Sequence, residues 1–120
     1  MAAQFARTTQ SISIEYYSET VDFTDAQKAK IERRLQKLSG GHRDIAGAFV
    51  AVHVVSGANR HQEYRARVVL YRRPSNVAAS STAGSISLAV QDALDAVARM
   101  TREQRERMRE RSRSRRAAAP

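Results

Sequence analysis

The residues of this chain whose types and spacing best suit a chemical role are basic side chains at helical intervals. Lys30, Arg33, Arg34 and Lys37 recur every three or four residues, which places them on one side of a helix. Glu32 is the only acid within the run, so ion pairs four residues apart cannot neutralise it. A solvated helix face is the ordinary interpretation of such a stripe, and an anion-binding surface is the functional one.

A second basic segment favours the functional interpretation. Between Arg99 and Arg116 the chain has nine arginines and three glutamates, and the whole chain carries a net charge of +9. This balance predicts a polyanionic partner, first nucleic acid and second an anionic membrane. Arginine suits phosphate because its planar guanidinium can donate two parallel hydrogen bonds. The candidate RNA-binding residues are Lys30, Arg33, Arg34, Lys37, Arg99, Arg102, Arg105 and Arg109.

Other kinds of site find little support in the sequence. The chain has no cysteine, which excludes a disulfide, a thiolate nucleophile and a Cys-ligated metal. His42, His53 and His61 do not have the spacing of metal ligands, and no serine is placed with a histidine and a carboxylate as a triad. We therefore expect no enzymatic activity, no cofactor and no metal.

The basic stripe lies on a helix that we predict over residues 25–39. Thr24 and Gln27 have the spacing of a capping box, and Gly40 with Gly41 supplies a left-handed residue for the helix end. An apolar stripe at i, i+4 and i+7 runs beside the basic one and consists of Ile31, Leu35 and Leu38. One side of this helix therefore packs on a core while the adjoining side is free to face anions.

Alternation of apolar and polar residues predicts strands that begin near Ser11, Phe49 and Glu63, with a hairpin loop at 57–62 between the last two. A weaker strand of small residues follows at 77–81. Tyr17, Phe49 and Tyr71 fall on the outward face of these strands. There they could stack on RNA bases, or another part of the chain could cover them.

Helical periodicity returns at Ser85, where an apolar stripe runs to Met100 and then gives way to arginine and glutamate. The predicted order is β-α-β-β-β-α, an α+β fold with two helices packed on one face of a four-stranded sheet.

We expect one domain over residues 11–105, after a flexible N-terminal arm at 1–10 and before an Arg-rich disordered tail at 106–120. The predicted core residues are Ile31, Leu35, Val52, Val68, Val90 and Val97. No signal region or membrane-spanning stretch is recognised, so we expect a cytoplasmic protein.

The element order and several short runs resemble the short ribosome hibernation-promoting factors, also called ribosome-associated inhibitors. The first-helix signature of that family is similar to two runs here, Thr24-x-Ala26 and Ile31-x-x-Arg34-Leu35-x-Lys37-Leu38. Further similar runs are the valine-rich strand at 50–55, the turn at Pro74 and the pair Ala79-Ser80. The resemblance covers roughly residues 11–105.

The resemblance implies a domain similar to a double-stranded RNA-binding domain, with basic helices that dock on small-subunit ribosomal RNA. Such a protein occludes the messenger and transfer RNA channel and inhibits translation in stationary phase or stress, without doing chemistry. Arg34 and Lys37 match basic family positions on the first helix, and Arg99 and Arg102 match on the second. The implied partner is the small ribosomal subunit, with no small-molecule substrate and no membrane, and we expect a monomer off the ribosome.

The chain departs from the family pattern at the start of its second helix. An acidic pair and a Met-Tyr are replaced here by Gly84, Ser85, Ile86 and Ser87, and a family lysine is replaced by Ala96. The first half of that helix is therefore less basic than the resemblance implies, and its end is more basic. Two other interpretations stay open: a double-stranded RNA-binding domain unrelated to ribosomes, and a protein-interaction module that modulates a transcription factor through its sheet face.

Overall fold

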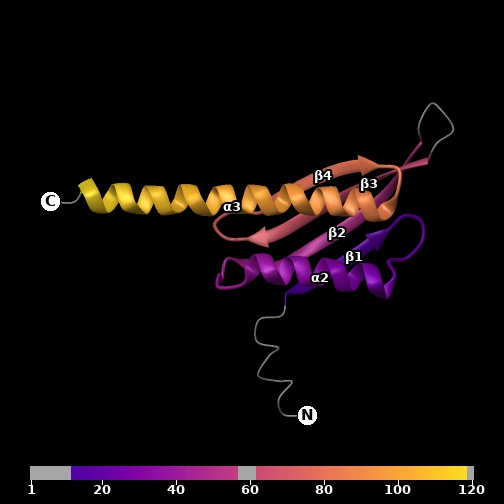
Figure 1. The fold of residues 1–120 in the computed structure, drawn as a ribbon, viewed down its shortest axis with the longest axis horizontal. Helices are drawn as coiled ribbons and strands as arrows, with labels where there is room; N and C mark the ends of the chain where they lie inside the picture. Colours follow the sequence, from indigo (N-terminus) through magenta and orange to yellow (C-terminus); the bar gives the residue numbers. More distant parts are fainter. Residues whose placement is uncertain (1–11, 57–61, 119–120) are drawn as a thin grey trace, which may run out of the picture.

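The computed structural model describes residues 12–56 and 62–118 and has the predicted order of elements (Figure 1). In chain order these are β1 (Ser13–Ser18), α2 (Asp25–Ser39), β2 (Ile45–Ser56), β3 (Gln62–Arg72), β4 (Val77–Ala83) and α3 (Ile86–Ala118). The predicted α+β class and the order β-α-β-β-β-α are therefore confirmed. The arm predicted at 1–10 and nearly all of the loop predicted at 57–62 lie outside the described residues.

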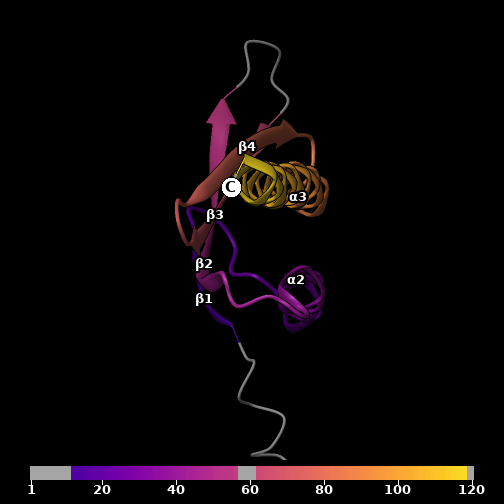
Figure 2. The same ribbon diagram turned by 90° about the vertical axis from the view of Figure 1, so that its left-hand side faces the viewer.

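The four strands form one mixed sheet in the order β1-β2-β3-β4. Strand β1 runs parallel to β2, and the other two pairs are antiparallel. Figure 2 shows both helices on the same face of this sheet, with α2 beside β1 and β2 and with α3 beside β3 and β4. The opposite face carries no helix in the part of the chain that the structure describes.

Helix α2 begins and ends as its sequence predicts. The backbone N–H of Gln27 donates to the Thr24 hydroxyl at 3.1 Å, and the N–H of Thr24 donates to the Gln27 side chain at 2.9 Å, which completes the capping box. After the helix, Gly41 adopts a φ of 74°, a left-handed conformation that glycine takes without a steric cost. Between these two ends the buried residues of α2 are Ile31, Leu35 and Leu38, the predicted apolar stripe.

The core lies between the sheet and the two helices. The inward rows of β2 and β3 are buried, with Val50 opposite Val68 and Val52 opposite Ala66. All six predicted core residues are buried, namely Ile31, Leu35, Val52, Val68, Val90 and Val97. The strands alternate apolar and polar residues, and the helices repeat apolar residues every 3.6 positions. Packing both helices on one face of the sheet buries all of these apolar faces in a single core.

Helix α3 differs from its prediction at the C-terminal end. It continues as one helix of 33 residues to Ala118, so residues 106–118 are helical where a disordered tail was expected (Figure 1). Arginine and glutamate are good helix formers, and Glu106 lies 3.8 Å from Arg109 and 3.3 Å from Arg113. Elongation of an existing helix also avoids the cost of nucleating a new one.

Candidate nucleic-acid interface

Helix α2 presents most of its cationic stripe to solvent. Its apolar stripe is buried, so the adjoining positions Lys30, Arg33 and Lys37 are held at the surface and are exposed. A helix on a packed core is a rigid support, and the three charges keep a defined spacing along it. This surface borders the space between α2 and α3.

A groove runs between α2 and α3. Its larger hollow has a volume of about 590 Å³ and carries Lys30, Arg33 and Arg34 along the α2 side. The apolar side chains that line this hollow include Ile31, Val90 and Leu94. A smaller adjoining hollow of about 190 Å³ is lined by Lys37 of α2 and Arg102 of α3, and it shares Arg34 and Leu94 with the larger one. We call the two together the α2–α3 groove.

The α2–α3 groove brings together five of the eight predicted RNA-binding residues. Four come from α2 and one, Arg102, comes from α3. Cations on two helices can neutralise phosphates on both sides of a bound strand, which a single helix face cannot do. The chemistry available to this groove is therefore the binding of a polyanion in a fixed orientation.

Arg34 is partly engaged within the protein. Its guanidinium makes a 2.7 Å ion pair with Asp95 of α3 and lies 3.5 Å from the Gln91 carbonyl oxygen. The Arg34 side chain is 38% exposed and the Asp95 side chain 58% exposed, so the pair stays accessible. No local pattern singles out Asp95, because neither it nor the neighbouring Asp92 carries a signal in the sequence of a partner on another helix.

Arg99 and Arg109 are exposed on α3 but line neither hollow of the α2–α3 groove. Arg109 has Glu106 as its neighbour at 3.8 Å. Of the candidate residues in the second basic segment, Arg102 alone lines the α2–α3 groove. Residues 86–98 of α3, which precede Arg99, carry Asp92 and Asp95 as their charged residues, in agreement with the sequence departures noted there.

The structure removes Arg105 from the candidate interface. Its side chain is 9% exposed, and its guanidinium donates to Asp44 through Nε at 2.9 Å and through a terminal nitrogen at 2.7 Å. The other terminal nitrogen donates to the Leu38 carbonyl oxygen at 2.9 Å. These groups are buried and bound inside the protein, so Arg105 holds elements together and does not face RNA.

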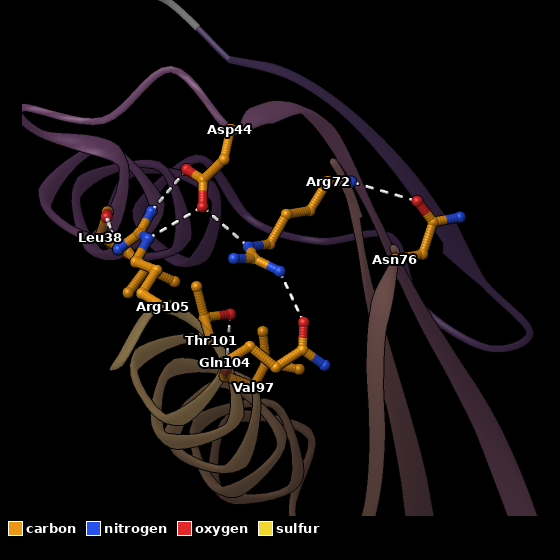
Figure 3. A network of polar contacts seen from close by, with 8 residues as sticks. All are labelled: Leu38, Asp44, Arg72, Asn76, Val97, Thr101, Gln104 and Arg105. Carbon is orange, nitrogen blue, oxygen red and sulfur yellow. Dashed lines mark hydrogen bonds and ion pairs between the residues drawn. The ribbon is translucent and has the colours of Figure 1, made fainter. Parts of the chain in front are cut away.

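Arg105 belongs to a polar cluster that joins three parts of the fold (Figure 3). Asp44 lies just before β2 and also accepts a hydrogen bond at 2.8 Å from Nε of Arg72, whose side chain is 1% exposed. Arg72 in turn donates at 2.6 Å to Gln104 of α3. We call Asp44, Arg72, Gln104 and Arg105 the Asp44 cluster.

Charge-assisted hydrogen bonds dominate the electrostatics of the Asp44 cluster. The bonds from Arg105, followed by the bond from Arg72, lower the pKa of Asp44 to about 2, against the opposing effect of its burial. Asp44 is therefore ionised throughout the physiological range. No local pattern in the sequence singles out Asp44, Arg72 or Gln104, because their partners lie 28 to 61 residues away in the chain.

The remaining candidate groups form no second site for chemistry. His53 lies 2.9 Å from Glu19 and packs against the Tyr17 ring, and the hydrogen bond from His53 is the main cause that lowers the pKa of Glu19. Within residues 12–56 and 62–118, no three His, Asp or Glu side chains gather as metal ligands. His61 lies outside the described residues.

Among the described helices none is both long and apolar enough to cross a membrane.

The open face of the sheet carries the aromatic residues predicted to point outward. Tyr17 and Tyr71 are exposed there, and Phe49 on β2 is half-buried. Arg67 lies in the same cross-strand row as Tyr17, and Arg65 lies in the next row beside His53. This face mixes aromatic, basic and acidic side chains, whereas the α2–α3 groove carries cations from both helices.

Comparison with known proteins gives two kinds of similarity. A family model described as sigma 54 modulation protein / S30EA ribosomal protein matches residues 14–109. A solved ribosomal subunit interface protein from Coxiella burnetii superimposes with a TM-score of 0.64 at 13% identity, over 79% of this chain and 99% of that one. The N-terminal domain of Protein Y from Thermus thermophilus gives a TM-score of 0.58 at 15% identity, over 78% of this chain and 97% of that one. A search of curated proteins found no match.

Proposed function

The chain belongs to the sigma 54 modulation protein / S30EA ribosomal protein family, and from this premise we propose that it docks on small-subunit ribosomal RNA through the α2–α3 groove. The membership confirms the resemblance to hibernation-promoting factors recognised in the sequence. On the ribosome the protein occludes the channel for messenger and transfer RNA and inhibits translation in stationary phase or stress. It acts in the cytoplasm by occupancy and without catalysis.

The observation that carries this proposal is the gathering of Lys30, Arg33, Arg34, Lys37 and Arg102 along one groove between two helices. Each cation that neutralises a phosphate releases condensed counterions, and this release supplies much of the free energy of binding to nucleic acid. The similarity in fold to a ribosomal subunit interface protein from Coxiella burnetii adds support for a ribosomal target.

A matched pair of charge reversals tests the docking face. Arg33→Glu with Lys37→Glu reverses two exposed charges beside the groove, and Arg65→Glu with Arg67→Glu reverses two exposed charges on the open sheet face. We expect the first variant to bind purified small ribosomal subunits at least about 100-fold more weakly, since two phosphate contacts become repulsions. The second variant should bind about as tightly as the unmodified protein.

The outcome also separates the rival functions. Loss of binding only in the sheet-face variant would contradict the proposal and favour a protein-interaction module. Mutual exclusion with messenger and transfer RNA on the subunit is expected from channel occlusion. Equal binding to an unrelated RNA duplex, with no such exclusion, would instead indicate a general double-stranded RNA-binding domain.

A further inference from the structure

The C-terminal part of α3 extends beyond the body of the protein. Residues 106–118, which we call the projecting segment, directly follow the buried Arg105, and every side chain from Glu106 to Arg116 is exposed. Figure 1 shows the segment continuing past the end of the sheet. At 1.5 Å per residue it reaches about 20 Å from the domain. It carries six arginines and two glutamates, a net charge of +4.

The distribution of these arginines indicates what kind of partner the projecting segment fits. Arg107, Arg111 and Arg115 follow one side of the helix at four-residue spacing, while Arg109, Arg113 and Arg116 follow another. Met108 is the only large apolar residue among the exposed positions 106–116, so no apolar face exists to enter a membrane. A helix that is cationic on two sides suits a cleft with phosphates on both walls, as in folded RNA.

The Asp44 cluster lies at the base of the projecting segment. Gln104 and Arg105 are the residues of α3 directly before it, and they bind Arg72 of β3, Asp44 before β2 and the Leu38 carbonyl of α2. Four side chains thus tie the helix to three other elements at the point where burial ends (Figure 3). Because α3 is continuous through this point, the same contacts that hold its base also set the direction of the projecting segment.

We propose that the projecting segment is a second RNA-binding surface, and that the Asp44 cluster holds it in a fixed direction so that it and the α2–α3 groove engage one folded RNA together. This inference rests on the proposed function, whose groove is a separate surface. Two sites on a rigid body bind as one, because the second contact forms at a high effective concentration when the geometry is already correct. Asp44 is in this view a positioning residue that never touches the RNA.

Binding to purified small ribosomal subunits tests the two parts of the proposal with different variants of the full chain. The first variant removes charge and keeps the helix, by Arg111→Gln, Arg113→Gln, Arg115→Gln and Arg116→Gln. The second keeps every charge and breaks the helix, by Ser112→Pro, with Ser112→Ala as its matched control. All substituted positions lie beyond the core, so the thermal unfolding of the domain should stay unchanged and serves as the check on folding.

We expect the charge-removal variant to bind more weakly and to reduce the slope of log affinity against log salt concentration by up to about 3. The Ser112→Pro variant should bind about 10-fold more weakly than Ser112→Ala, because the detached arginines lose their fixed direction. Asp44→Asn should weaken binding when α3 is otherwise unmodified. Added to Ser112→Pro, the same substitution should weaken binding little beyond the effect of Ser112→Pro alone. That non-additivity distinguishes a positioning role from a general loss of stability.

An unchanged affinity and salt slope in the charge-removal variant would overturn the second surface. Equal binding by Ser112→Pro and Ser112→Ala would overturn the fixed direction. If either result is obtained while the Arg33→Glu, Lys37→Glu variant still loses binding, the proposed function survives and this inference fails. If the groove variant also binds like the unmodified protein, the proposed function itself fails.

Discussion

At the scale of single residues, Asp44 links two buried arginines of different elements. One carboxylate accepts three hydrogen bonds from two arginines, at 2.7, 2.8 and 2.9 Å. Burying two guanidinium groups would be costly without such a partner, since an unpaired buried charge loses its hydration and gains nothing in return. Asp44 therefore makes it possible for Arg72 and Arg105 to lie inside the protein.

The lowered pKa of Asp44 predicts how stability depends on pH. Its pKa is about 2 in the folded protein against an ordinary value of 3.8, so the stabilisation is present above pH 3.8 and is lost as the pH falls toward 2. This difference corresponds to about 2 kcal/mol of unfolding free energy. Urea unfolding at a series of pH values should show Asp44→Asn less stable by about 2 to 5 kcal/mol at pH 7.

Comparing the unmodified protein with Asp44→Asn separates the effect of Asp44 from that of the other carboxylates. Glu19 also has a lowered pKa, but it is present in both proteins and its contribution cancels in the difference. The stability gap between unmodified protein and Asp44→Asn should therefore narrow by about 2 kcal/mol between pH 4 and pH 2. A gap that stays constant over that interval would show that Asp44 is not the group that titrates.

Arg105 marks the limit of what local sequence can predict at this scale. Its position in an arginine-rich run indicates an exposed, RNA-facing residue, as Arg102 and Arg109 indeed are exposed. Its burial depends on Asp44, 61 residues earlier, and on the chain turn that brings the two together. Arg34 on α2 was predicted as an RNA-binding residue and lines the α2–α3 groove, but its pairing with Asp95 again depends on how two helices lie.

At the scale of the elements, the Arg34–Asp95 pair joins α2 to α3 at the α2–α3 groove, and in the proposed docking it would compete with an incoming phosphate. Both side chains are exposed, so the pair contributes under about 1 kcal/mol to stability. Asp95→Asn should free Arg34 and tighten binding to small ribosomal subunits about two- to five-fold, with little change in thermal unfolding.

Asp92→Asn is the matched control for this prediction. Asp92 is exposed on the same helix three residues earlier, and its removal changes the net charge by the same amount. Any general gain from lower negative charge appears in both variants, whereas release of Arg34 appears only in Asp95→Asn. Equal affinities of the two variants, measured side by side at one salt concentration, would show that the pair does not restrain Arg34.

The elements themselves were largely predictable because their signals are local. The Thr24–Gln27 capping box and the alternation along β2 and β3 are complete within a few residues, and the structure has both. The end of α3 was not predictable in the same way. Absence of core-facing residues after Arg105 indicated disorder, but continuation of a helix anchored at its base needs only weak local pairs such as Glu106 with Arg113.

At the scale of the whole molecule, the two faces of the sheet have different characters. The helical face gathers cations from α2 and from the C-terminal part of α3, and the projecting segment extends the positive charge beyond the sheet. The open face carries Arg65 and Arg67 among aromatic and acidic residues. If the proposed docking is correct, these described cations should orient the protein as it approaches a polyanion, with the helical face toward it.

This asymmetry predicts a steep and face-specific salt dependence. Five groove cations that each neutralise a phosphate give a slope of log affinity against log salt concentration of about −4, and the projecting segment makes it steeper. Affinity for small ribosomal subunits should thus fall by more than about 100-fold between about 50 and about 200 mM potassium chloride. The Arg65→Glu, Arg67→Glu variant should keep this slope because its charges lie on the other face. A slope of log affinity against log salt concentration no steeper than about −1 would contradict this prediction. It would correspond to about one released counterion, too few for five cations that each neutralise a phosphate, so other contacts would have to hold the complex.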